Sequence, residues 1–134
     1  MVRRAEAVER ERFEDLVISA LSELPEEFQE RLENVDVVVQ DYPDRKQRTR
    51  LRRDMSLLGL YEGVPHTQRT RGYNLALPDR ITLFQKPIEA MCRGENEIAA
   101  EIRKVVRHEI AHHFGFDEES LRRIESRTPR PRFK

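Results

Sequence analysis

The sequence predicts a small α+β domain, and three observations carry this prediction. Apolar residues recur at helical spacing near both ends of the chain. Three short segments between those ends have the composition or the alternation of strands. Helices and strands are therefore expected in the order α-α-β-β-β-α-α, and a length of 134 residues suits one domain. We expect residues 1–134 to form a compact domain, with a small mixed sheet packed against an N-terminal helix and a long C-terminal helix.

The N-terminal half predicts two helices and a strand. Apolar residues at helical spacing predict an amphipathic helix over roughly residues 5–24. These apolar residues are Phe13, Leu16, Val17, Ala20, Leu21 and Leu24. Pro25 suits the first turn of a second, short helix whose inner side carries Phe28 and Leu32. Residues 35–39 are rich in β-branched side chains, so they predict a strand that ends near Pro43.

Residues 45–53 stand out by charge. They hold six basic residues in nine and show no apolar period, so we expect a mobile loop there. The segment contains no aromatic residue that could stack on bases, which argues against a nucleic-acid partner. The whole chain has 25 basic and 25 acidic residues, so no global field attracts nucleic acid or acidic lipid.

The C-terminal half predicts two strands and two helices. The expected elements are a short strand at 58–63, a connecting loop at 63–79, a strand at 80–85, a turn or single helical turn between Pro87 and Gly94, a long helix from about Asn96 to His113 or Phe114, and a short helix at about 117–126. Gly115 follows the long helix where a left-handed cap is favoured. Residues 127–134 are predicted to be a disordered tail.

The long helix carries the pattern His108-Glu109-Ile110-Ala111-His112. At about 100° per residue, both imidazoles and the carboxylate continue the stripe of the helix that faces the core. That stripe consists of Ile98, Ile102 and Val105. Two His one turn apart can bind a single zinc ion, and a neighbouring, offset Glu suits a general base that acts on zinc-bound water. A merely solvated helix face would not align with apolar residues. We therefore predict His108 and His112 as metal ligands and Glu109 as the catalytic base.

A third ligand is expected just after this helix. Gly115 lets the chain reverse, and Asp117, Glu118 and Glu119 follow at once. Acidic residues at this point also suit the N-terminus of the next helix, through capping and the helix dipole. We assign Asp117 to the cap and Glu118 to the metal, because Glu118 is one methylene longer and follows two spacer residues. The reverse assignment, with Asp117 on the metal, stays open.

The other chemistry-bearing residues are expected to be structural. His113 points away from the metal side of the helix, where a hydrogen-bonding role is more common than ligation. The single Cys92 excludes an internal disulfide and fits a reducing compartment. No stretch has the apolar length of a membrane span, and the N-terminal segment predicts a helix rather than a signal peptide. We therefore expect a cytoplasmic protein with no membrane partner.

Residues His108 to Leu121, with the sequence HEIAHHFGFDEESL, resemble the minimal zincin-like metallopeptidase family of bacteria. The resemblance extends upstream through residues 58–65 and 77–84, and so covers most of the chain after the first helix. It implies a compact zincin core, a zinc ion held by two His and an acidic residue, and peptidase activity. The members resemble Asp-zincins, in which the acid after the glycine is usually Asp, whereas this chain has Glu118 there. The chain also lacks the Met that follows the motif in metzincins.

Three hypotheses of function follow from these residues. The first is a zinc metallopeptidase that hydrolyses short peptides or unfolded protein, with the strand at 80–85 as the edge to which an extended peptide adds. The second is a zincin-derived metal-binding regulatory or interaction protein without proteolytic activity. The third is a metal-dependent RNA hydrolase, which the basic residues at 45–53 and in the tail suggest. The sequence does not single out an oxyanion stabiliser among the candidates Arg80, His66, Tyr61 and Tyr73.

Overall fold

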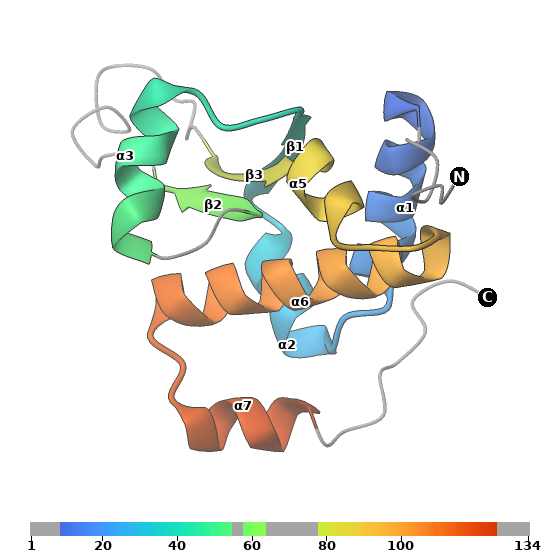
Figure 1. The fold of residues 1–134 in the computed structure, drawn as a ribbon. Helices are drawn as coiled ribbons and strands as arrows, with labels where there is room; N and C mark the ends of the chain where they lie inside the picture. The colour runs from blue at the N-terminus through green and yellow to red at the C-terminus, as the bar shows by residue number, and fades with distance from the viewer. Residues whose placement is uncertain (1–8, 55–57, 64–77, 126–134) are drawn as a thin grey trace.

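The computed structural model describes residues 9–54, 58–63 and 78–125 (Figure 1). The elements along the chain are α1 (Arg10–Ser22), α2 (Glu26–Leu32), β1 (Val35–Gln40), α3 (Arg45–Asp54), β2 (Gly59–Glu62), β3 (Asp79–Phe84), α5 (Gln85–Ala90), α6 (Glu95–Phe114) and α7 (Glu118–Glu125). A small mixed sheet combined with helices confirms the predicted α+β class. The predicted tail at 127–134 and most of the predicted loop at 63–79 lie outside the described residues.

Strand β3 occupies the centre of the sheet. The strand order is β1-β3-β2, in which β1 runs parallel and β2 antiparallel to β3. The prediction that residues 80–85 form an edge strand is therefore wrong. Four successive side chains of β3 are buried, Ile81 and Leu83 on one face and Thr82 and Phe84 on the other. This burial is typical of a central strand that is covered on both faces. Within the described part of the sheet, β2 is the outer strand that borders α6.

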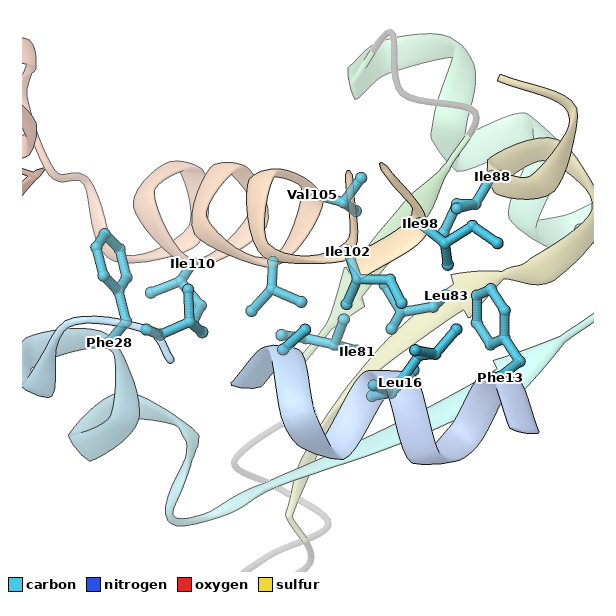
Figure 2. Close-up of a cluster of buried hydrophobic side chains, with 14 of the residues drawn as sticks. Phe13, Leu16, Phe28, Ile81, Leu83, Ile88, Ile98, Ile102, Val105 and Ile110 are labelled. Atoms are coloured by element: carbon cyan, nitrogen blue, oxygen red, sulfur yellow. The ribbon is translucent and has the colours of Figure 1, made fainter. Parts of the chain in front are cut away.

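The main core lies between one face of the sheet and helices α1 and α6 (Figure 2). Its largest fully buried side chains are Phe13, Leu24, Phe28, Ile81, Leu83, Ile88, Ile98, Ile102 and Ile110. Burial of each such side chain stabilises the fold by roughly 1.5–3 kcal/mol, so this core fixes α6 firmly against the sheet. Leu60 and Phe84 form a second, small buried cluster.

Residues 45–53, predicted to be a mobile loop, form helix α3 instead. The helix begins with a reciprocal cap, in which the N–H of Gln47 donates to Oδ1 of Asp44 at 2.8 Å and the N–H of Asp44 donates to Oε1 of Gln47 at 2.9 Å. Gln47 is buried, and its amide exchanges hydrogen bonds of 2.9 and 3.1 Å with the amide of Gln40 on β1. These polar contacts attach α3 to the sheet. The helix has no apolar stripe, and for that reason the sequence predicted a loop.

The other helices lie close to their predicted ranges. α1 and α2 correspond to the two predicted N-terminal helices, and α7 to the short helix predicted at about 117–126. α5 supplies the helical turn expected before Gly94, but it begins at Gln85, ahead of Pro87 and inside the range predicted as a strand. Pro87 lies near the start of α5, where no N–H donor is required. No helix within the described ranges is both long and apolar enough to cross a membrane.

Candidate metal centre

Helix α6 carries the pattern His108 to His112 near its C-terminal end and stops at a glycine. Gly115 adopts φ 70° and ψ 32°, a left-handed conformation that glycine takes at lower cost than residues with a Cβ. The N–H of Phe116 then donates to the carbonyl of Ala111 at 2.9 Å and closes the end of the helix. The predicted helix stop at Gly115 is confirmed.

The imidazoles of His108 and His112 lie one turn apart on the same side of α6. Their ring centroids are 6.2 Å apart and their planes differ by 16°. Both residues are exposed, so the prediction that the imidazoles continue the buried stripe of α6 is wrong. They lie beside that stripe, near the end of the helix, and are exposed to solvent. Their position keeps both rings accessible to an ion and to a substrate.

Glu109 lies on the buried stripe, as predicted, and is only 4% exposed. Its Oε1 accepts a hydrogen bond of 3.0 Å from the backbone N–H of Tyr61 on β2. Tyr61 pairs with Ile81 of β3, and this N–H points away from β3 towards α6. A buried carboxylate is costly unless it is hydrogen-bonded, so the bond stabilises Glu109 and restricts its direction. The candidate base is thus held by the outer strand of the sheet.

Tyr61 also joins β2 to the end of α6 through its side chain. Its hydroxyl donates to Oδ2 of Asp79 at 2.7 Å, and its ring stacks on His113 with centroids 3.9 Å apart and planes at 18°. Nε2 of His113 lies 4.0 Å from the same oxygen of Asp79. His113 therefore packs against the sheet, in line with its predicted structural role. No sequence pattern identifies Tyr61 and Asp79 as the partners of His113, because both contacts join segments that are distant in the chain.

Aromatic side chains on both sides of Gly115 hold the turn after α6 in place. Cζ of Arg31 on α2 lies 5.1 Å from the ring centroid of Phe114 and 5.7 Å from that of Phe116, within the range of cation–π contacts. Phe116 also packs against Phe28, with ring centroids 5.9 Å apart. Helix α2 therefore fixes the chain reversal from which the acidic residues emerge.

Asp117 caps helix α7. Its Oδ1 accepts a hydrogen bond of 2.7 Å from the backbone N–H of Ser120, as expected of an N-cap carboxylate. This bond to Ser120 holds the pKa of Asp117 below its ordinary value. Glu118 is the first residue of α7, directly after the cap. Its side chain is outside the part of the chain that the structure describes.

The side chains of the other candidate residues have different roles or lie outside the described residues. Arg80 is an exposed residue of β3, and Tyr61 serves as a buried packing residue. Burial raises the pKa of the Cys92 thiol, so this cysteine is a weak nucleophile and a weak ligand. His66 and Tyr73, two further candidates for stabilising an oxyanion, lie outside the described residues.

The donor set suits zinc. Imidazole nitrogens and carboxylate oxygens are common zinc donors, and a catalytic zinc site uses three protein ligands. Among the side chains that the structure describes, no group of three His, Cys, Asp or Glu could hold a metal. The side chain of Glu118, the predicted third ligand, is not one of these described side chains.

One family of known proteins matches this chain. A sequence model of the family described as zincin-like metallopeptidase matches residues 32–128, which is more than half of the chain. The matched range includes β1, all of α6 and the acidic residues at the start of α7. The search of curated proteins found no match to this chain.

Proposed function

Because the chain belongs to the zincin-like metallopeptidase family, we propose that it is a zinc-dependent peptidase. In this proposal His108, His112 and Glu118 hold the metal, and Glu109 is the general base. The substrates are short peptides or unfolded protein segments. We place the protein in the cytoplasm, in line with its lone and buried Cys92.

One observation carries the proposal. Two exposed, nearly parallel imidazoles stand one helical turn apart, beside a buried carboxylate that is held by a backbone N–H. A catalytic metal must keep one coordination position open to substrate, whereas the base must be held in one direction. The exposure of His108 and His112 and the burial of Glu109 meet these two requirements.

Zinc bound at this site would supply a Lewis acid that lowers the pKa of water and polarises the scissile carbonyl. Glu109 then accepts a proton from the attacking water and returns it to the departing amine nitrogen. The peptide bond is thereby replaced by a carboxyl group and an amine. The hydrogen bond from Tyr61 restricts rotation of the carboxylate, so the base is oriented before the substrate arrives.

We place the extended substrate along β2 instead of the strand at 80–85. β1 and β2 are the two outer strands of the described sheet, and β2 is the one that borders α6 and Glu109. An added peptide strand gains main-chain hydrogen bonds whatever its side chains are, which suits a small domain with broad preference. The N–H of Tyr61 bonds Glu109, so an added peptide strand pairs with other groups of β2 and leaves this bond in place.

The proposal is tested by elemental analysis together with a screen of internally quenched peptides. We expect about one zinc per chain after reconstitution, from two His and one acid. Glu109→Gln should keep zinc but lower kcat/KM by ~10²–10⁴-fold, since an amide accepts no proton from water. Glu97→Gln, the same substitution at an exposed position of α6, serves as the matched control and should retain full activity.

The outcomes separate the hypotheses. A protein that takes up no zinc after reconstitution is not a zinc peptidase. Full activity in Glu109→Gln would contradict the assigned base. Zinc binding without turnover of any peptide would instead support a zincin-derived binding or regulatory protein.

A further inference from the structure

We propose that the exposed face of α3 binds acidic segments of the polypeptide substrate. This proposal rests on the peptidase function proposed above, and it adds a substrate class to it. The surface, which we call the basic surface, consists of Arg45, Lys46 and Arg48, with Tyr42 in the turn just before the helix. All four residues are exposed.

The cations of the basic surface are not neutralised within the described part of the chain. Arg50, further along α3, bonds Glu62 on β2 at 2.9 Å, but Arg45, Lys46 and Arg48 form no ion pair with any described acid. The chain as a whole is neutral. A concentration of unpaired positive charge on one helix of a neutral protein therefore favours a local, negatively charged partner.

The basic surface stands on a fixed helix. The reciprocal cap between Asp44 and Gln47 sets its first turn, and the paired amides of Gln40 and Gln47 attach it to β1. The bond between Arg50 and Glu62 attaches its other half to β2. Cations on a fixed helix lose less conformational freedom on binding than cations on a mobile loop, so they bind a partner more tightly.

The second half of α3, which follows the basic surface, lies beside the strand on which we place the substrate. Glu62, the partner of Arg50, directly follows Tyr61, whose N–H holds Glu109. Figure 1 shows α3 at the same end of the molecule as the C-terminal end of α6. An extended peptide of about ten residues spans roughly 33 Å, which is twice the ~15 Å length of a ten-residue helix such as α3. Such a peptide can contact the basic surface and β2 together.

Polypeptide is favoured over nucleic acid as the partner. α3 itself carries no aromatic residue, and Tyr42 alone offers a ring for stacking, whereas single-stranded nucleic acid binds best to several rings along a basic groove. Tyr and Arg are also the residue types most enriched at protein–protein contacts. The neighbouring pattern of α6 belongs to a metallopeptidase family.

The test measures binding by fluorescence anisotropy, on zinc-loaded full-length protein that carries Glu109→Gln so that the probe is not cleaved. The probes are a Glu-rich peptide of about ten residues, a Gln-rich peptide of equal length, and a single-stranded RNA of about ten nucleotides. The variant Arg45→Gln/Lys46→Gln/Arg48→Gln removes the basic surface while it keeps good helix formers and the Asp44 cap. The control Arg93→Gln/Arg103→Gln/Lys104→Gln removes the same charge elsewhere. Among the described residues it breaks one ion pair, a solvent-accessible one between Arg103 and Glu23.

We expect the Glu-rich peptide to bind more tightly than the Gln-rich peptide. Its affinity should fall as salt rises from about 0.05 to 0.5 M. The Kd of the Glu-rich peptide should be about tenfold higher for the basic-surface variant, as expected for the loss of three exposed ion pairs. The control variant should leave this Kd unchanged. Equal binding by the basic-surface variant and the control overturns the proposal. Tighter binding of RNA that is lost in the basic-surface variant also overturns it, and assigns the surface to nucleic acid. Since binding is read without hydrolysis, a failure of the peptidase function leaves these results interpretable.

Discussion

The backbone N–H of Tyr61 donates a hydrogen bond of 3.0 Å to Oε1 of Glu109, across a sequence separation of 48 residues. The bond joins the outer strand of the sheet to the helix that carries the candidate zinc ligands. Glu109 is almost fully buried, so the bond is shielded from water and correspondingly strong. The direction of the candidate base therefore depends on where β2 lies, although β2 contains none of the residues predicted to bind metal.

Hydrogen exchange at the amide of Tyr61 tests this relationship directly. In Glu109→Ala the amide loses its acceptor, so its exchange should become faster than in the wild-type protein. In Glu109→Gln the side-chain carbonyl can still accept the bond, so protection should be largely kept. NMR-detected exchange resolves the single amide, and the amide of Leu60 on the same strand serves as the reference. Equal protection of Tyr61 in the wild type and Glu109→Ala would show that the bond does not form in solution.

Tyr61→Phe tests whether the side chain of Tyr61 positions β2. The substitution removes the hydroxyl bonded to Asp79 and keeps the ring stacked on His113. We expect the free energy of unfolding to fall by about 1–3 kcal/mol, because a hydrogen bond to a charged group is lost. Urea denaturation measures this change. Tyr42→Phe, which removes the same atom from an exposed ring, should change stability little, and equal losses in the two variants would contradict a special role for Tyr61.

The local features of this protein were predictable from its sequence. The apolar period of α6, its stop at Gly115 and the burial of Glu109 depend on residues within a few turns of one another. The cap formed by Asp117 is equally local, since its partner Ser120 lies three residues away. The sequence therefore predicted the helix that carries the candidate site and the burial of Glu109, but it placed the exposed His108 and His112 on the buried stripe.

The long-range features were not predictable in the same way. The central place of β3 depends on pairing with two strands from different parts of the chain, and alternation along one strand does not reveal it. The loop predicted at 45–53 is wrong because the helix there has no apolar stripe. The buried residue among its described side chains is Gln47, which is polar. The pair Asp44 and Gln47 fits the capping-box spacing, and this signal could have predicted the start of the helix.

Gly59→Ala tests the close approach of β2 to α6. A Cβ at Gly59 would lie 2.6 Å from Cγ1 of Val105 and 3.3 Å from the carbonyl oxygen of Thr82. We expect a loss of about 1–3 kcal/mol in the free energy of unfolding, as for other overpacked cores. Val105→Ala removes the clashing methyl group. The double variant Gly59→Ala/Val105→Ala should therefore lose less stability than the two single variants lose in total.

Gly94→Ala is the control for this experiment. Its Cβ would meet nothing within 4 Å, and its extended backbone suits any residue. Additive losses in the double variant of Gly59 and Val105 would show that the clash is relieved by some other movement.

The last prediction concerns the third metal ligand and compares Asp117→Ala with Glu118→Ala. The carboxylate of Asp117 accepts the N–H of Ser120, so its removal leaves a helix end unsatisfied and should lower the melting temperature by a few degrees. Zinc affinity should change little in this variant. Glu118→Ala should instead weaken zinc binding by more than the roughly 10–100-fold that loss of an outer partner of a ligand costs.

Competition with a zinc chelator measures the affinities, and thermal melts of the metal-free protein measure the stabilities. Glu119→Ala removes a neighbouring exposed carboxylate from the same helix turn and should change neither quantity. If Asp117 were the ligand instead, its carboxylate would have to move from its place at the cap in order to reach the metal. Zinc would then weaken the start of α7, and Asp117→Ala would show the larger loss of zinc affinity. That ranking would move the third ligand to Asp117, while the two imidazoles of α6 would keep their assignment.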